Sequence, residues 1–237
     1  MTHLYPDTLI QKSTNYFLTH RVLPISKYLH PGACLIDIGC GAGVFVRFMR
    51  DRGFDAKGLD ISQSSVQIGK KHLNLNDYLS VGNWEALPNI PTYDAITAWT
   101  VIEHLLEPEA FVQRCREALK PNGLLLLEFP TVDSLLYRIF ESLFFWVMPP
   151  YHLVLFSRLG IQKLLARQGF EIMTIYPMPQ NWYFSDCVAR RCGVHLDKVC
   201  EQAPEARSIF KEIDRIFDLI ALQQDQASSI QIICRKI

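Results

Sequence analysis

The 237-residue sequence has no excess of charge of either sign, no CxxC cysteine pair, no internal repeat and no low-complexity tract. Lysine and arginine together number 24, as do aspartate and glutamate, so the formal net charge is zero. Because a protein that binds a polyanion normally carries a basic excess, DNA and RNA are disfavoured as main partners. The length suits one sizeable α/β domain with insertions.

Cysteine patterning points away from disulfides and from zinc. Seven cysteines are scattered over the chain, and an odd number without pairs suggests reduced thiols. We therefore expect a cytoplasmic protein. Cys187, Cys192, His195 and Cys200 lie close together in the sequence, but their spacing fits no standard zinc ligand pair.

Signals for membrane insertion are also missing. The N-terminus lacks the basic segment and apolar segment of a signal peptide. The most apolar stretch, residues 134–148, is too short to span a bilayer and carries Arg138 and Glu141. We expect no transmembrane segment, while this stretch could line a pocket or contact a membrane surface peripherally.

Apolar runs alternate with amphipathic stretches along most of the chain. After an N-terminal helix at 7–29, strands are predicted at 33–38, 56–60, 78–81, 93–99, 124–129, 170–176 and 228–235. Helices are predicted at 43–52, 62–72, 107–119 and 157–168, with Ser62 as an N-cap and a turn at 121–123. Strands and helices in this alternation predict a parallel sheet with helices on both faces.

Residues 179–226 are predicted to form an insertion before the last strand. Its second half is predicted to be a helix with apolar side chains on one face: Ile209, Ile213, Ile216, Phe217 and Ile220. This stripe is expected to belong to the core or to a dimer contact, so both a monomer and a homodimer remain open.

The most informative stretch lies at the end of the first predicted strand. Asp37 is followed by glycines at alternate positions: Gly39, Gly41 and Gly43. Such glycines indicate a strand-to-helix turn on which a ligand lies against bare backbone. In an open α/β sheet, ligands bind at such carboxyl ends of strands. The dinucleotide fingerprint requires another glycine where Val44 stands, and no P-loop lysine follows.

The segment Asp37–Gly43 resembles motif I of the class I S-adenosylmethionine-dependent methyltransferases. The resemblance implies that the loop, including Gly39, Cys40, Gly41 and Gly43, passes close to the amino acid end of the cofactor. Asp37 would order the loop and bind the cofactor's ammonium group through water. The alternative is a tight turn that binds no ligand.

Two further segments extend the resemblance. Asp60 ends the second predicted strand and matches the acidic residue that accepts the ribose hydroxyls, and Ile61 would pack on the adenine. Residues 81–88 resemble the adenine-binding segment, with Asn83 where aspartate is common and Trp84 where a small residue is usual. The alternatives are a helix cap for Asp60 and simple packing for Trp84.

Later segments match the family in the same order. Residues 98–108 resemble a "VxEHxxDP" segment, 119–125 an "LKPGG" segment, and 152–170 an "HxxxFS…LL…GF" run. Trp99, at the end of the fourth strand, is expected to join the cofactor site. The resemblance covers about residues 33–175 and implies a three-layer, doubly wound, Rossmann-like α/β fold. Its sheet would have seven mostly parallel strands and an antiparallel last strand.

One methyltransferase domain is therefore expected over residues 1–237. It would consist of an N-terminal helical cap (1–32), a cofactor-binding core (33–130), a lid (131–156) and the helical insertion (179–226). The implied cofactor is S-adenosylmethionine, and S-adenosylhomocysteine is its product.

Two histidines are candidate catalytic residues. Methyl transfer is an in-line displacement, and a hydroxyl acceptor also needs a general base to remove its proton. His104 and His152 are suitable because imidazole titrates near neutrality, and both lie in segments expected at the carboxyl edge of the sheet. The alternatives are loop anchoring for His104 and a purely structural role at the end of the lid for His152.

The ubiquinone-pathway O-methyltransferases are similar in this region. They carry Glu-x-x-Glu-His, implicated in divalent metal binding, where this chain has Thr100-x-x-Glu103-His104. Because one carboxylate is missing, no metal is predicted.

The lid is rich in aromatic residues: Phe140, Phe144, Phe145, Trp146 and Tyr151. These residues favour an apolar or aromatic small-molecule acceptor, although core packing explains most of them equally well. We therefore expect O-methylation of a small molecule. A sugar or lipid-quinol acceptor, a cofactor-binding protein without turnover and a dehydrogenase-like nucleotide binder are the alternatives, and Val44 argues against the last.

Overall fold

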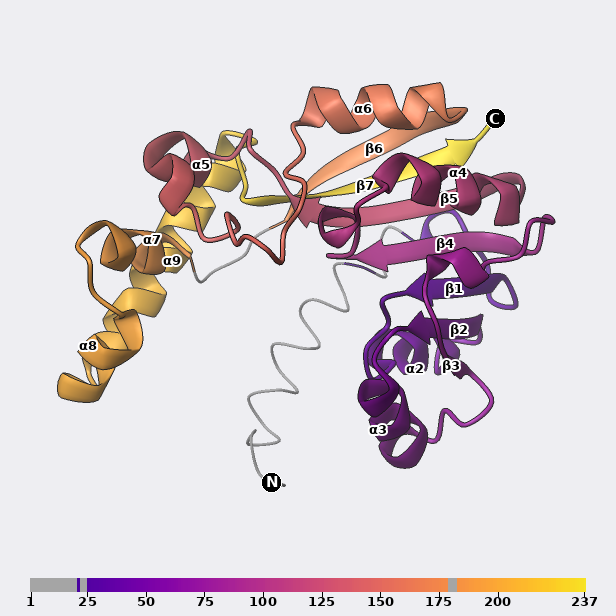
Figure 1. Cartoon of the computed structure of the whole chain (residues 1–237), viewed down its shortest axis with the longest axis horizontal. Helices are drawn as coiled ribbons and strands as arrows, with labels where there is room; N and C mark the ends of the chain where they lie inside the picture. Colours follow the sequence, from indigo (N-terminus) through magenta and orange to yellow (C-terminus); the bar gives the residue numbers. More distant parts are fainter. Residues whose placement is uncertain (1–20, 22–24, 179–182) are drawn as a thin grey trace. The chain divides into compact units, whose positions relative to one another are not determined.

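The computed structural model describes residue 21, residues 25–178 and residues 183–237 (Figure 1). Most of the N-terminal helix predicted at 7–29 lies outside the described residues. The chain divides into two compact units, residues 1–97 with 117–125 and residues 98–116 with 126–237.

Seven strands form one sheet in the order β3-β2-β1-β4-β5-β7-β6. The strands are β1 (Cys34–Ile38), β2 (Asp55–Asp60), β3 (Leu79–Val81), β4 (Tyr93–Trp99), β5 (Leu119–Pro130), β6 (Phe170–Met178) and β7 (Ser229–Lys236). β1 pairs with β2 and β2 with β3 in parallel, whereas β6 and β7 are antiparallel. The expected methyltransferase-type sheet with an antiparallel last strand is confirmed.

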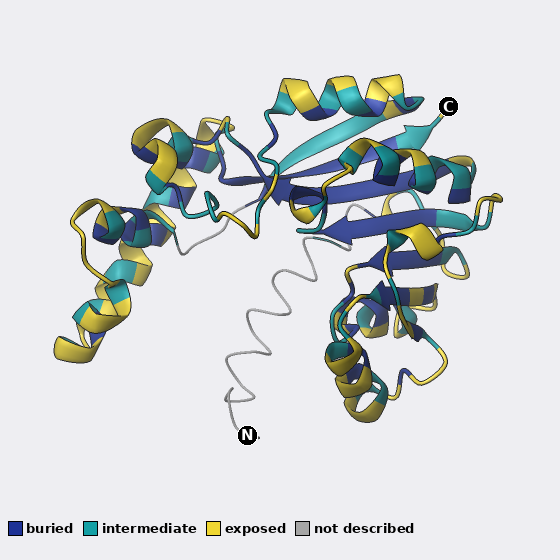
Figure 2. Ribbon diagram, in the orientation of Figure 1, coloured by how far each residue is buried: buried dark blue, intermediate teal, exposed yellow. Residues whose placement is uncertain are grey.

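In the first unit, two helices cover the strands that carry the glycine loop. They are α2 (Val44–Arg50) and α3 (Gln63–Leu73), followed by the short helix η1 (Trp84–Ala86). Ser62 is the N-cap of α3, as predicted, and its Oγ accepts a hydrogen bond from the backbone N–H of Ser65 at 3.2 Å. β1 is largely buried (Figure 2), and β2 buries alternate residues, so the loops at the ends of these two strands are held on a packed base.

The second unit contains residues 131–156, the predicted lid, and the described part of the predicted insertion. Its helices are η2 (Ile102–His104), α4 (Pro108–Ala118), α5 (Leu135–Phe140), η3 (Glu141–Leu143), α6 (Arg158–Arg167), α7 (Phe184–Arg191), α8 (Leu196–Gln202) and α9 (Ala206–Gln223). α6 lies along β6 (Figure 1). Leu136, Phe140, Phe144 and Cys187 form a buried cluster that joins the lid to the insertion. Several lid aromatics are therefore core residues.

The predicted turn at 121–123 is wrong, because β5 already begins at Leu119 and continues through these residues. Asn122 adopts a left-handed conformation with φ 62° inside the strand, which asparagine tolerates better than most residues. The ammonium of Lys120 lies 2.9 Å from both carboxylate oxygens of Asp94 on β4. This contact holds the start of β5 in place.

The isoleucine stripe of α9 does not belong to the core. Ile209, Ile213, Ile216 and Ile220 are between 39% and 57% exposed. The helix instead buries Asp214, which accepts a hydrogen bond from the backbone N–H of Ser185 at 2.7 Å, and its half-buried Phe217 stacks on Phe184. The core expectation is wrong for the isoleucines, and a dimer contact stays a prediction.

None of the helices in the described part of the chain combines the length and apolar character that a bilayer crossing requires.

Candidate active site

The glycine loop joins β1 to α2. Gly39, Gly41 and Gly43 all have left-handed backbones, with φ values of 71°, 56° and 75°. A Cβ added to Gly43 would lie 2.8 Å from the side chain of Leu79, so this glycine permits close packing. A Cβ added to Gly41 would meet nothing within 4 Å. The backbone at Gly41 therefore borders open space that a ligand can fill.

Asp60 ties this loop to the neighbouring strand. Its Oδ2 accepts a hydrogen bond from the backbone N–H of Gly41 at 2.7 Å, and its Oδ1 accepts one from Ser62 at 2.7 Å. Each carboxylate oxygen still has a lone pair for a further donor. Beside Asp60, Ile61 is 78% exposed. A carboxylate for ribose hydroxyls and an exposed apolar side chain for a purine thus stand together and fit the nucleoside part of S-adenosylmethionine.

Asp37 is almost fully buried and accepts a hydrogen bond from Thr97 Oγ1 at 2.6 Å. Burial raises the pKa of this carboxyl to about 7, against the opposing effect of the Thr97 hydrogen bond. A nearby ammonium group would favour the ionised form and return the pKa toward its ordinary range. Asp37 is therefore suited to a cationic ligand, as the expected role requires.

The other expected cofactor residues have different surroundings. Cys40 is buried, and a Cβ on Gly58 would lie 2.6 Å from its Sγ, so only the Cys40 backbone is available to a ligand. Asn83 accepts a hydrogen bond from the Glu85 backbone N–H at 3.2 Å and donates one to the Glu85 carboxylate at 2.9 Å. Trp84 is half-buried, and Trp99 is buried at the end of β4. Their contacts with adenine stay predictions.

In the second unit, the structure brings His104 and His152 together, with ring centroids 4.7 Å apart. The Nδ1 of His104 lies 2.8 Å from the carbonyl oxygen of Tyr151, and that of His152 lies 2.8 Å from the carbonyl oxygen of Trp146. Because a carbonyl can only accept, each Nδ1 must carry the hydrogen. In the neutral rings, both Nε2 atoms therefore keep a lone pair for a proton or a metal ion.

Glu103 completes this cluster. It is fully buried, and neither carboxyl oxygen has a hydrogen-bond partner among the described residues. Burial raises its pKa to about 8, so the group is mostly neutral at pH 7. Donor atoms of Glu103, His104 and His152 lie within 4.8 Å of one another, close enough to hold a divalent ion. The sequence comparison considered Glu103 and His104 but missed their approach to His152, which depends on how the lid folds.

A family model for a methyltransferase domain matches residues 10–175 of this chain, which is more than half of it. The ubiquinone biosynthesis O-methyltransferase of Actinobacillus pleuropneumoniae is 24% identical over 184 residues, covering 72% of this chain and 73% of the relative. Other relatives of that name match over shorter stretches, such as 37% of the mitochondrial protein of Schizosaccharomyces pombe and 48% of that of Pasteurella multocida.

Solved methyltransferase structures have the same fold. An S-adenosylmethionine-dependent methyltransferase from Archaeoglobus fulgidus gives a TM-score of 0.61 at 18% identity, covering 93% of this chain and 94% of that one. The magnesium protoporphyrin IX methyltransferase of Synechocystis PCC 6803, solved with SAH bound, gives 0.60 at 16% identity, covering 96% and 83%. At these identities the likeness is one of fold.

We predict that Asp37→Asn removes a pH-dependent loss of folding stability from the cofactor-free protein. Between the ordinary pKa of 3.8 and the folded value of about 7, the carboxyl loses its proton in the unfolded chain only. The free energy of unfolding of the parent should therefore fall relative to the variant by about 1.4 kcal/mol per pH unit in that window. Urea unfolding from about pH 5 to about pH 8 measures this difference, with exposed Asp77→Asn as the control. Parallel pH curves for the parent and Asp37→Asn would contradict the assignment.

We predict that Asp60→Ala weakens binding of S-adenosylhomocysteine by about 1.5–3 kcal/mol, the value of a hydrogen bond to a charged group. Asp55→Ala, at the other end of β2, should leave the affinity unchanged. Calorimetry with the 2′-deoxy analogue separates ribose binding from loop ordering. The deoxy analogue should bind the parent more weakly than the full compound, and this difference should disappear in Asp60→Ala. Equal losses for both compounds would mean that Asp60 only orders the loop.

Proposed function

This chain belongs to the class I S-adenosylmethionine-dependent methyltransferases, and from that premise we propose that it methylates a hydroxyl group of a small molecule. When bound, the cofactor supplies a methyl group on a sulfonium centre, which a nucleophile displaces in line. The chain must hold the cofactor, align the acceptor and remove the hydroxyl proton.

The residues of the first unit are proposed to hold the cofactor. The backbone at Gly41 leaves room for a ligand, and the free lone pairs of Asp60 are suited to the two ribose hydroxyls. Asp37 would compensate the ammonium group in its ionised form, and Ile61 would cover the purine. These roles agree with the positions of the four residues at the ends of β1 and β2.

The histidine pair carries the proposal of a hydroxyl acceptor. A hydroxyl becomes a good nucleophile only as its proton leaves, so a base within reach lowers the barrier. Burial lowers the pKa of His152, with a smaller effect from His104, and the hydrogen bond to Trp146 opposes the shift. His152 therefore stays neutral at pH 7 and can accept a proton at Nε2. The relatives of this chain in ubiquinone biosynthesis are named as O-methyltransferases, which supports oxygen as the acceptor atom.

We predict that radiolabelled S-adenosylmethionine transfers its methyl group to a hydroxyl compound in a screen of phenols, quinols, sugars, carboxylic acids and amines. With the acceptor found, His104→Ala and His152→Ala should each lower kcat by about 100- to 10,000-fold and leave cofactor affinity unchanged. Exposed His72→Ala is the matched control. Because the His152 pKa lies below its ordinary value of 6.5, the acid-side loss of turnover should come below about pH 6.5.

Three results would contradict this proposal. Methylation of amines alone would show that the acceptor atom is nitrogen and not oxygen. Cofactor binding without any methylated product would indicate a binding protein without turnover. Full activity in both histidine variants would show that neither is the base. Turnover should also persist after chelation of divalent ions, because Thr100 stands where the metal-binding segment of the ubiquinone-pathway O-methyltransferases has a second carboxylate. Loss on chelation with recovery on adding a metal would assign the cluster to metal binding.

A further inference from the structure

The imidazole of His152 is held by two neighbouring residues of the second unit. Its Nδ1 lies 2.8 Å from the carbonyl oxygen of Trp146, and the indole of the same residue stacks on the imidazole. The two ring centroids are 5.2 Å apart, and the ring planes are inclined by only 16°. The ring of His104 lies at 4.7 Å and is inclined by 75°. Trp146 therefore makes two of these three contacts.

The two contacts of Trp146 restrict the imidazole in different ways. A hydrogen bond at Nδ1 fixes one ring atom but lets the ring tilt about that atom. The stacked indole restricts the plane of the ring, because aromatic pairs favour such an arrangement. With one atom and the plane fixed, the lone pair on Nε2 has one direction. A base must aim its lone pair at the proton that it removes, so the indole bears on the proposed proton transfer.

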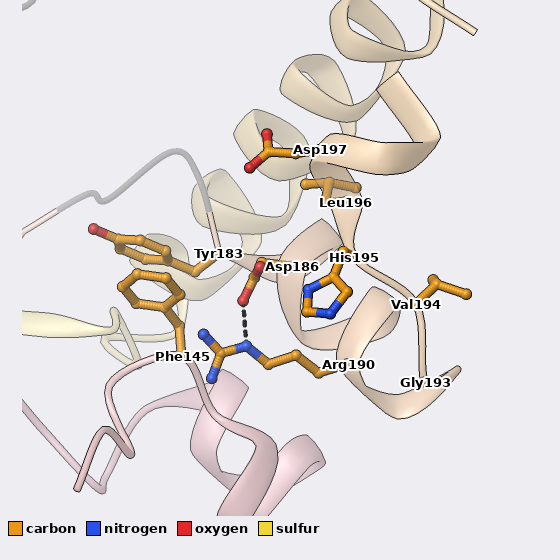
Figure 3. Close-up of a pocket in the computed structure, with 9 residues that line it drawn as sticks. All are labelled: Phe145, Tyr183, Asp186, Arg190, Gly193, Val194, His195, Leu196 and Asp197. Carbon is orange, nitrogen blue, oxygen red and sulfur yellow. Dashed lines mark ion pairs between the residues drawn. The ribbon is translucent and has the colours of Figure 1, made fainter. Parts of the chain in front are cut away.

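Trp146 is itself held by two aromatic rings. The centroid of its indole lies 5.3 Å from that of Phe145 and 5.1 Å from that of Tyr183, and both contacts are edge-to-face. Phe145 and Tyr183 stack on each other with centroids 4.2 Å apart and planes inclined by 19° (Figure 3). This stacked pair supports the indole and limits its rotation away from His152.

Tyr183 connects these rings with the predicted insertion. It immediately precedes α7, whose first residue, Phe184, stacks on Phe217 of α9 at 4.5 Å. The backbone N–H of Ser185 donates a hydrogen bond to Asp214 of α9 at 2.7 Å. The start of α7 is therefore fixed to α9. The insertion thereby holds the tyrosine ring and, through that ring, the indole.

We propose that Trp146 is a positioning residue for His152 and that the insertion acts on the base through Trp146. Tyr183 holds the indole, and the indole holds the plane of the imidazole. The consequence for turnover rests on the proposed function, in which His152 removes the hydroxyl proton. The restriction of the imidazole by the indole does not rest on it and has its own measurement.

The first measurement follows the imidazole by NMR. Protons over the face of an indole are shielded by its ring current, so stacking shifts the ring C–H resonances of His152, which His152→Ala identifies by their loss. At about pH 8, where imidazoles are neutral, Trp146→Leu should move these resonances toward those of exposed histidines. Tyr183→Leu should move them in the same direction by less. Tyr137→Leu, which removes a ring that pairs with Phe144 at 5.9 Å, is the matched control and should leave them unchanged.

The second measurement follows turnover with the acceptor found in the screen. Trp146→Leu should lower kcat by about 10- to 100-fold, because the base is no longer aligned with the hydroxyl proton. The KM for S-adenosylmethionine should stay unchanged. Trp146→Phe keeps a flat ring beside the imidazole and should restore most of kcat.

Variants of Tyr183 test the role of the insertion. Tyr183→Leu should lower kcat less than Trp146→Leu, because it acts one ring further from the base, and Tyr183→Phe should behave as the parent. The double variant with leucine at both positions should lose no more than Trp146→Leu alone, because both changes act through the indole. Unchanged affinity for S-adenosylhomocysteine in all variants reports an intact cofactor site.

Resonances of His152 that stay in place in Trp146→Leu would overturn the inference, whatever the activity. So would equal losses of kcat in Trp146→Leu and Trp146→Phe, or full turnover in Trp146→Leu while His152→Ala is inactive. Parent-like resonances and kcat in Tyr183→Leu would overturn the role of the insertion. The proposed function fails separately. Full turnover in His152→Ala would contradict the proposed base, whereas shifted resonances in Trp146→Leu would still show that the indole holds the imidazole.

Discussion

The carboxylate of Asp60 is the contact on which the glycine loop depends. The N–H groups of Gly39 and Cys40 both donate to the carbonyl oxygen of Leu59, at 2.8 Å and 3.2 Å, and that of Gly41 donates to Asp60 at 2.7 Å. Three successive loop residues are therefore fixed to the end of β2 without help from a ligand. A site arranged in advance spends less of its binding energy on ordering. The same carboxylate keeps lone pairs free, so its structural role is compatible with the proposed binding of ribose.

Local signals made much of the fold predictable. Apolar runs followed by glycine or an acidic residue predicted the first strands. Ser62 predicted the start of α3, because a hydroxyl at the N-cap accepts a hydrogen bond from a free backbone N–H of the helix. The start of β5 was not predictable in this way. Pro121-Asn122-Gly123 has the composition of a turn, yet these residues continue β5, and the distant contact between Lys120 and Asp94 ties the start of that strand to β4. Short-range patterns do not contain such contacts.

Hydrophobic periodicity likewise identifies an apolar stripe on a helix but does not determine whether that stripe is buried. The isoleucines of α9 are spaced as a buried face would be, yet Asp214 and Phe217 decide the orientation through Ser185 and Phe184. The prediction of the candidate base from sequence is limited in the same way. His104 and His152 were each recognisable from their segments, but their contact depends on the carbonyl groups of Tyr151 and Trp146, which the fold of the lid places beside the rings.

Glu103 shows why the histidine cluster is more than a packing contact. A buried carboxyl without a partner costs stability, and cores seldom retain one for packing alone. Its raised pKa reduces this cost by keeping the group neutral at pH 7. The backbone N–H groups of Leu153 and Val154 donate to the Glu103 carbonyl oxygen at 2.8 Å and 3.2 Å, so the same residue also fixes the end of the lid. Local conflicts with stability concentrate at functional sites. A buried acid with no partner among the described residues, beside two oriented imidazoles, therefore supports the proposed proton transfer at this point of the chain.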